Sequence, residues 1–444
     1  MKRWQTGRKR YLLYGAIFIV FFVYSLLTLD PDFGWHLSAG QYFLHHGIPA
    51  TDIFTYTART FPWIDHEWLS DLIVAGLYGA GSYWLVAMSY AVLWTTGVVL
   101  VSKKVHPVLI VTATTALLPF AGARTVALSV VGVALLVTLL RQKNHQWRLL
   151  LPLVFLVWAN VHGSFLLGIA YVAYQAYRER SKELIMLGLI SLICTFINPY
   201  GASLYTEIIR TMTDTSLHQT IFEWQAVAFP IASVPYLLVW IAFLVVRNKK
   251  DWKRYLRFDV LLFIASIMSI RMTPLFVIIS LPSLAHLVRD VRDSMTIVNQ
   301  RIIKRGVLAL ATAVLLLALA SIVTDIVASS NRYPWRAVEY LRAHPCEGNV
   351  FNLYDFGGFL IWQLPDEKVY IDGRMPSWEQ DSHKYMQDYL RIYRDKAFRA
   401  TQFAHYDIRC VVDNSNSSLV KELTSEGWRV AVGDDNTALL LDSR

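Results

Sequence analysis

Long apolar segments separated by short polar ones make up most of the chain between Tyr11 and Val327. The apolar runs reach roughly 17 to 25 residues, the length of a helix that crosses the hydrocarbon core of a bilayer. Because a backbone in hydrocarbon must satisfy its own hydrogen bonds, this repetition predicts a polytopic bundle of transmembrane helices. The predicted spans are residues 11–29, 67–82, 84–102, 105–121, 124–140, 149–162, 163–177, 183–198, 234–247, 257–271, 273–289 and 307–327.

The pattern changes near residue 331, where the apolar runs shorten to strand length and charges become frequent. Such alternation of short strands and helices is typical of a small α/β sandwich. We therefore expect a mainly α transmembrane part at residues 1–330 and a soluble α/β domain at residues 331–444. Strands are predicted at residues 349–353, 369–372, 408–412, 428–432 and 437–441, and helices at residues 359–364 and 384–403.

Composition excludes a single soluble domain, because 55% of the 444 residues are hydrophobic and only 17% are charged. The mean hydropathy is +0.38. The net charge of +9 does not indicate nucleic acid, since the basic residues lie between the apolar runs and not in one patch. This is the positive-inside pattern, and it predicts a cytoplasmic N-terminus. The basic clusters are residues 2–10, 141–148, 178–182, 247–257 and 289–305.

The last basic cluster precedes one final span, so the C-terminal domain is expected outside the cytoplasm. An odd number of helices follows, about 11 or 13, and the glycine-broken runs at residues 67–121 could include a re-entrant or interfacial helix. No small-residue cleavage site follows Leu29, so the first span is expected to be retained. Cys346 and Cys410 both fall in the C-terminal domain, and two positions leave their pairing open.

Unusual polar residues gather in the loops that this charge pattern places outside. Asp30 and Asp32 directly follow the first span, and two acids one residue apart suit a shared divalent cation, Mg²⁺ or Mn²⁺, or a general base. The alternative is a polar loop in which Asp30 merely ends the helix. Trp35 and His36, next to them, are candidate substrate-binding residues.

Asp65, His66 and Glu67 stand before the second apolar run. Charges at such a position cost free energy unless they face a cavity or a partner, which makes these residues candidates for substrate binding. The alternative is that Asp65 and Glu67 cap a helix and complement its dipole.

Four further candidates interrupt or flank apolar segments. Asn160 and His162 lie within an apolar hairpin and either line a cavity or form an interhelical pair. Glu223 and Arg271 lie beside apolar spans on the outer side. Arginine there could bind phosphate through two hydrogen bonds, or it could reach lipid headgroups.

Taken together, these segments resemble uncharacterised prokaryotic members of the GT-C glycosyltransferase superfamily. They are distantly similar to dolichyl-phosphate-mannose protein mannosyltransferases and lipid A aminoarabinose transferases. The resemblance covers nearly the whole chain. It is carried by DPDFGWHLSAGQYFLHHGIPATDIFTYT, WIDHEWLSD, WANVHGSFLLG, NPYG, IFEWQ and YDFGGFLIWQLPDEKVYIDGR.

The resemblance implies a GT-C fold of about 11–13 helices, a catalytic carboxylate at Asp32 or Asp30, and a sugar donor carried on a polyprenyl phosphate. It places Asp65, His66 and Glu67 at a second acidic patch, and Asn160, His162 and Arg271 near the lipid phosphate. The acceptor would be an extracytoplasmic glycan, lipid or protein, and no nucleotide cofactor is expected. The chain departs from the mannosyltransferases by ending the first loop in Asp-His-Glu-Trp, in place of a glutamate-rich, proline-containing signature.

Two other functions fit the same pattern. A transporter or flippase of lipid-linked intermediates would also place polar groups within a helical bundle. No internal repeat of the kind common in such transporters is recognisable. A membrane scaffold that binds a glycan without catalysis is the second alternative.

Overall fold

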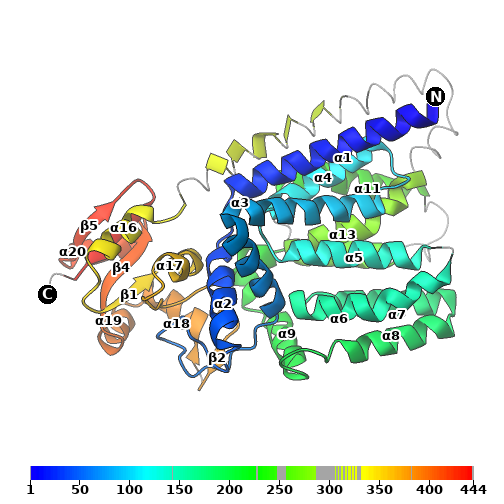
Figure 1. Cartoon of the computed structure of the whole chain (residues 1–444). Coiled ribbons are helices and arrows are strands. Elements are labelled where there is room, and N and C mark those ends of the chain that lie inside the picture. Colours follow the sequence, from blue (N-terminus) through cyan, green and yellow to red (C-terminus); the bar gives the residue numbers. More distant parts are fainter. Residues whose placement is uncertain are drawn as a thin grey trace. The chain divides into compact units, whose positions relative to one another are not determined.

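The computed structural model describes residues 2–142, 144–226, 229–247, 257–286, 332–381 and 383–442, with scattered residues between 306 and 327 (Figure 1). The basic cluster at residues 289–305, most of the one at residues 247–257 and part of the predicted span at 307–327 lie outside this set. The chain separates into two compact units. The helical unit comprises Met1–Thr28, Tyr83–Ala202 and Thr215–Ile326, and the mixed unit comprises Leu29–Ser82, Ser203–Asp214 and Val327–Arg444.

This grouping differs from the division expected at residue 330, because the first loop clusters with the C-terminal residues. Backbone pairing explains the difference. Tyr56 N donates to Val369 O at 3.2 Å, and Val369 N donates to Phe54 O at 3.0 Å. The segment 369–372 is therefore not a strand of the C-terminal sheet, as predicted, but pairs with the first loop.

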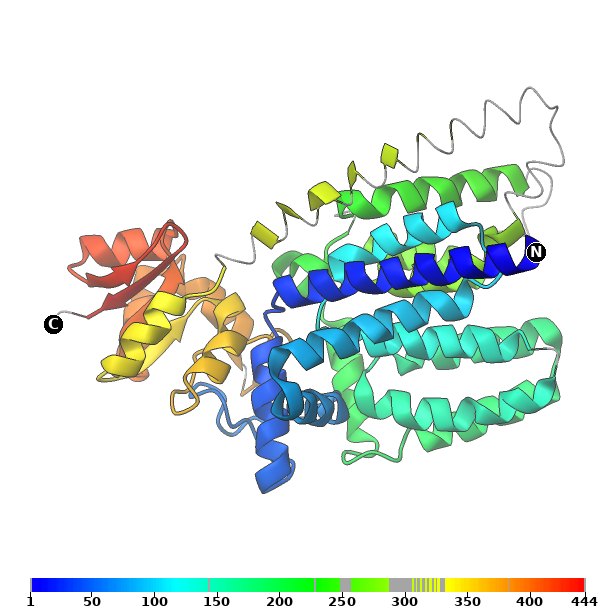
Figure 2. The same ribbon diagram turned by 45° about the horizontal axis from the view of Figure 1, so that its top comes forward.

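Most helices of the helical unit occupy the apolar runs predicted from the sequence, whereas the four-residue helix Leu217–Thr220 lies outside them. Neighbours such as α5 and α6, and α7 and α8, run alongside one another (Figures 1 and 2). Proline in the first turn starts α4, α6 and α13, where its missing N–H costs no intrahelical bond. The bounds are α1 (Lys2–Leu27), α3 (Trp68–Val101), α4 (Pro107–Leu117), α5 (Val126–Leu140), α6 (Leu151–Val161), α7 (Phe165–Glu179), α8 (Lys182–Cys194), α10 (Leu217–Thr220), α11 (Val234–Arg247), α12 (Phe258–Met268) and α13 (Thr273–Ser280).

Two of the described helices, Arg8–Leu27 within α1 and Trp68–Val101, are long and apolar enough to cross a membrane. The second loses helical geometry at Gly81 and Ser82, where the chain passes from the mixed unit to the helical unit. The glycine-broken pattern around residue 81 thus marks a real interruption. Shorter apolar helices are Pro107–Phe120, Val126–Leu140, Ile231–Leu244, Phe258–Met268 and Ile270–Ala285.

A small sheet organises the C-terminal part of the mixed unit. Its strand order is β1-β4-β6-β5, with β1 parallel to β4 and the other neighbours antiparallel. The expectation of a mainly helical chain with a small C-terminal sheet is confirmed. The elements are α16 (Trp335–Ala343), β1 (Asn349–Asn352), α17 (Gly357–Gln363), β2 (Glu379–Gln380), β3 (His383–Lys384), α18 (Tyr385–Ile392), α19 (Lys396–His405), β4 (Ile408–Asn414), α20 (Ser418–Ser425), β5 (Arg429–Gly433) and β6 (Thr437–Leu441).

Three local features of the mixed unit go beyond the sequence patterns. The predicted helix at residues 384–403 is two helices, because Asp395 leaves helical geometry and caps α19 by accepting from Phe398 N at 3.0 Å. Cys346 and Cys410 form a disulfide. The segment expected to be a loop after the first span contains α2 (Phe33–His46), and α9 (Ser203–Thr213) also joins this unit.

Candidate functional site

The acidic pair lies in the turn that leads into α2. Asp32 N donates to Asp30 Oδ1 at 3.0 Å, and Trp35 Nε1 donates to Asp32 Oδ1 at 3.0 Å. Asp32 is also the residue before the first turn of α2, where the positive end of the helix dipole favours a carboxylate. Both aspartates are half-buried. The turn therefore holds a carboxylate in a defined orientation, with an indole N–H on one oxygen.

A buried group of acids surrounds His36 one helical turn further on. His36 Nδ1 lies 2.6 Å from Asp71 Oδ1, and His36 Nε2 lies 3.6 Å from Glu67 Oε2. Glu67 N donates to Asp65 Oδ1 at 2.9 Å. Asp65 is 2% exposed and Asp71 is fully buried. Burial raises the Asp65 pKa well above its ordinary value, and the neighbouring Asp71 raises it further.

Three of the predicted residues, His36, Asp65 and Glu67, thus meet in one cluster, and Asp71 completes it. His66 remains at its edge, with Nε2 3.9 Å from Glu67 Oε1 and a side chain that is about one-third exposed. Asp71 was not singled out from the sequence, although it lies one helical turn beyond Glu67 and its N–H donates to Glu67 O. A helical periodicity starting at residue 67 would have pointed to it.

Replacing Asp65 with asparagine is expected to stabilise the protein at neutral pH and to flatten its pH dependence. Because the folded-state pKa of Asp65 is raised, the folded protein binds a proton that the unfolded chain has already lost. Stability therefore falls as the pH rises through the window between the ordinary and the raised pKa. Asparagine keeps the size and a hydrogen-bond donor but carries no titrating proton.

Thermal midpoints in detergent, compared between about pH 5 and pH 8, measure this effect. Asp435→Asn is the matched control, since the Asp435 carboxylate lies on the surface. An equal slope of midpoint against pH in the parent and in Asp65→Asn would contradict the prediction.

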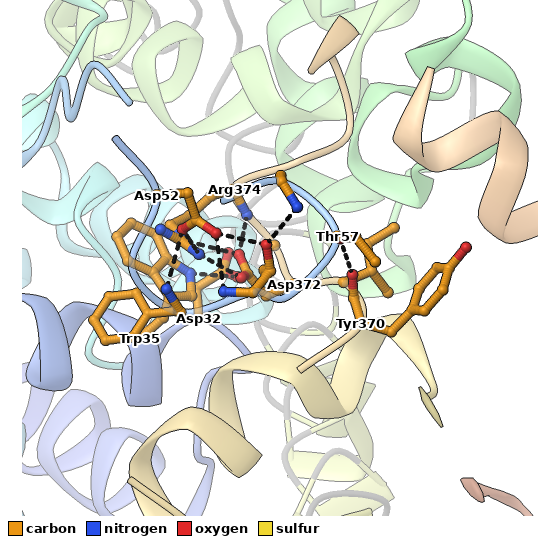
Figure 3. Close-up of polar contacts among 12 residues, drawn as sticks. Asp32, Trp35, Asp52, Thr57, Tyr370, Asp372 and Arg374 are labelled. Atoms are coloured by element: carbon orange, nitrogen blue, oxygen red, sulfur yellow. Dashed lines mark hydrogen bonds and ion pairs between the residues drawn. The ribbon is translucent and has the colours of Figure 1, made fainter. Parts of the chain in front are cut away.

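A buried arginine beside the acidic turn was missed at the sequence level. Arg374 binds Asp372 through two bonds, Nε to Oδ1 at 2.8 Å and Nη2 to Oδ2 at 2.6 Å. Nη2 also lies 2.8 Å from Asp52 Oδ1, and the three side chains are at most 3% exposed. Figure 3 shows Asp32 and Trp35 next to this ion triplet.

Aromatic rings enclose the same guanidinium. The Arg374 Cζ atom lies 4.9, 4.5 and 5.3 Å from the ring centroids of Phe54, Trp63 and Trp378. Burial lowers the Arg374 pKa, but the two carboxylates outweigh burial and hold that pKa above its ordinary value. A charge in an apolar cage must be paired, so an arginine two residues after an aspartate in an apolar stretch was the available signal.

The helical unit contains a second polar group that includes two predicted residues. Arg124 forms an ion pair with Glu223, and Arg271 lies over the Trp224 ring with its Cζ 5.4 Å from the centroid. Burial raises the Glu223 pKa, but Arg124 and Arg271 together lower it below its ordinary value. The structure thus brings Glu223 and Arg271 together and adds Arg124, whose partner is far away in the sequence.

Asn160 and His162 take part in polar contacts inside the helical unit. Asn160 Nδ2 donates to Leu156 O at 2.8 Å and to Ile197 O at 2.9 Å. His162 Nδ1 lies 3.0 Å from Ser164 Oγ, and Ser164 N donates to the same nitrogen at 3.1 Å. The Asn160 bond to Ile197 O joins two segments of the helical unit, whereas the His162 contacts are local to its hairpin. A role of either residue in substrate binding stays a prediction.

Metal ligation requires several convergent donors. The part of the chain that the structure describes contains no group of three or more His, Cys, Asp or Glu side chains placed to hold a metal ion. Mg²⁺ or Mn²⁺ binding at Asp30 and Asp32 stays a prediction, and no step below is derived through it.

The fold is that of GT-C glycosyltransferases of known structure. ArnT from Cupriavidus metallidurans bound to undecaprenyl phosphate matches with a TM-score of 0.56 at 11% identity, over 97% of each chain. The Archaeoglobus fulgidus oligosaccharyltransferase tethered with an acceptor peptide matches with a TM-score of 0.56 at 10% identity, over 90% of this chain and 69% of that one. The same organism's AglB, in complex with an inhibitory peptide and a dolichol-phosphate, matches with a TM-score of 0.55 at 11% identity, over 91% and 70%.

No family model matches the chain, and no curated protein is found to match it. The resemblance to GT-C glycosyltransferases is thus confirmed at the level of the fold. Because a shared fold supports different activities, the reaction must be argued from the residues of the site.

Proposed function

We propose that the protein is a multi-pass membrane glycosyltransferase that moves a sugar from a polyprenyl-phosphate donor to an acceptor at the outer face. The proposal rests on the Asp32 carboxylate. Trp35 Nε1 donates a hydrogen bond to it, and it lies at the start of α2, directly after an apolar helix. The fold supports it, because ArnT and AglB were solved with undecaprenyl phosphate and dolichol-phosphate.

Exposed apolar side chains support a membrane location for the helical unit. Only 22% of the apolar window of Arg8–Leu27 is buried, whereas the core helix of a soluble protein is mostly buried. Along α8, Ile185, Leu189 and Ile193 are more than half exposed. Apolar surface of this extent is costly in water and suits lipid, and the number of about 11–13 spans stays a prediction.

Two independent features support an outward-facing mixed unit. The basic N-terminal segment is expected in the cytoplasm, so the end of α1 and the acidic turn after it emerge on the other side. The Cys346–Cys410 disulfide belongs to the same unit as Asp32, and structural disulfides persist in oxidising compartments outside the cytoplasm. The N-terminus is accordingly proposed to be cytoplasmic and the C-terminal residues extracytoplasmic.

Asp32 is proposed to act as the general base. Its carboxylate takes the proton of an acceptor hydroxyl or amine as the acceptor atom attacks the anomeric carbon of the sugar. The bond between that carbon and the phosphate oxygen breaks, and its electron pair leaves with the polyprenyl phosphate. Trp35 orients the base through the bond from Nε1 to Asp32 Oδ1.

Within the helical unit, Arg124 and Arg271 are proposed to bind a lipid phosphate. Guanidinium groups match phosphate oxygens in pairs. Glu223 forms an ion pair with Arg124, and the positive charges of Arg124 and Arg271 lower the Glu223 pKa. Asn160 and His162 would lie near the same lipid phosphate, as the resemblance implies.

The transfer reaction is tested with purified full-length protein in proteoliposomes and radiolabelled undecaprenyl-phosphate hexoses. We expect label to leave the lipid and appear on an acceptor from an envelope extract, with undecaprenyl phosphate as the second product. Movement of the intact labelled lipid between leaflets, without release of the sugar, would instead support a transporter. Binding of glycan with neither transfer nor movement would support a scaffold.

A further inference from the structure

The carboxylate of Asp32 is enclosed by a turn from the far end of the chain. A Cβ atom placed on Gly373 would overlap Asp32 Oδ1. The φ angle of Gly373 is not in the left-handed region, so its backbone conformation does not require glycine. A side chain at residue 373 would therefore displace the Asp32 carboxylate from its position.

The other side of the acidic turn is packed as closely. A Cβ on Gly358, at the start of α17, would overlap Pro31 O, and a Cβ on Gly34 would overlap Gly358 O. The Phe33 ring packs edge-on against the Trp362 ring, with 5.4 Å between the ring centroids. Helices α2 and α17 therefore approach backbone to backbone around the residues that carry the acid.

The turn that touches Asp32 is itself rigidly held. Arg374 N donates to Asp372 Oδ1 at 2.9 Å, and the Arg374 side chain binds the same carboxylate and Asp52. Tyr354 Oη donates to Gly373 O at 3.4 Å. The Arg374 guanidinium is ion-paired with both carboxylates inside the aromatic cage, and displacing it would separate buried opposite charges, so the turn has little freedom to move.

We propose that the Asp372-Gly373-Arg374 turn is a positioning element that sets the location of the Asp32 carboxylate. This proposal rests on the function proposed above, in which Asp32 acts on the acceptor. Gly373 is a positioning residue because it leaves the space that the carboxylate occupies, and Arg374 is one because it anchors the turn. Misplacing a catalytic group by about 1 Å is enough to lower a rate about 100-fold.

Gly373→Ala in the full-length protein is the direct test. We expect kcat for sugar transfer to fall about 100-fold, while KM for the labelled undecaprenyl-phosphate hexose changes less than about threefold. The matched control is Gly76→Ala, a glycine of the same unit at which a Cβ meets open space. Its kcat should equal that of the parent.

A double variant separates positioning from general destabilisation. Asp32→Ala removes the group that the new Cβ would meet, so Gly373→Ala should lower the thermal midpoint of the parent but not that of Asp32→Ala. If Gly373→Ala alone fails to fold, the double variant should recover the folded yield. An equal loss in both backgrounds, or no recovery, overturns the proposed contact.

The outcomes also distinguish this proposal from the proposed function. If Asp32→Asn is inactive while Gly373→Ala keeps the kcat of the parent, the positioning role is overturned and the function stands. If Asp32→Asn itself transfers sugar at the rate of the parent, the function assigned to Asp32 fails and the positioning proposal fails with it.

Discussion

Replacing Asp32 with asparagine is expected to lower glycosyl transfer about 100- to 10,000-fold, the range that a general base contributes. Asparagine has nearly the same size, and its carbonyl oxygen can still accept from Trp35 Nε1, so the turn should keep its structure. It cannot take a proton from the acceptor at neutral pH. Initial rates of label transfer from a polyprenyl-phosphate hexose measure the loss, and the thermal midpoint verifies folding.

Two variants make this result specific. Asp435→Asn changes an exposed carboxylate of the same unit and should leave the rate unchanged. Asp30→Asn retains the oxygen that accepts from Asp32 N and should lose less activity than Asp32→Asn. If Asp30→Asn is inactive while Asp32→Asn remains active, the base is Asp30 and the assignment to Asp32 is wrong.

Replacing Arg374 with methionine is expected to destabilise the protein by about 3–5 kcal/mol, the usual cost of removing one partner from a buried ion pair. The change leaves Asp52 and Asp372 facing each other in an apolar cage without a counter-charge. Arg374→Lys should recover only part of the loss, because an ammonium group cannot form the two parallel bonds to Asp372. The folded yield and the thermal midpoint in detergent measure both variants.

Arg391→Met is the control for this effect. Its ion pair with Asp395 has a similar distance of 2.8 Å, but the Arg391 side chain is 57% exposed. An exposed pair of this kind contributes little to stability, because water and salt screen its charges. Similar losses in Arg374→Met and Arg391→Met would contradict the conclusion that burial makes the Arg374 triplet important for stability.

Several elements of the site could be predicted because their cause is local. An apolar run followed at once by Asp30 and Asp32 predicts a helix that ends before the two acids, because charged side chains are costly within the apolar span. The helix α2 was not predicted because its 14 residues are too few for a span and carry polar positions throughout. Its buried face is matched to α17, and that partner cannot be recognised from the periodicity of either segment alone.

The burial and the partners of Arg374 could not be predicted from its own segment either. The aspartate two residues before Arg374 is the one local hint of pairing, but an arginine with a neighbouring aspartate is more often found in water than buried. Its role depends on Asp52 and on the rings of Phe54, Trp63 and Trp378, most of which come from the first loop. Only folding brings these groups together.

The sequence by itself determined the apolar helices, the four strands of the small sheet and the acidic turn after the first span, since each follows from hydrophobic period or from spacing within a few residues. Tertiary structure alone decided that the first loop joins the C-terminal residues. Thr57 Oγ1 donates to Tyr370 O across 313 positions of sequence. Contacts of that range depend on complementary shape and on pairing of buried charges, which are properties of two surfaces together and not of either segment.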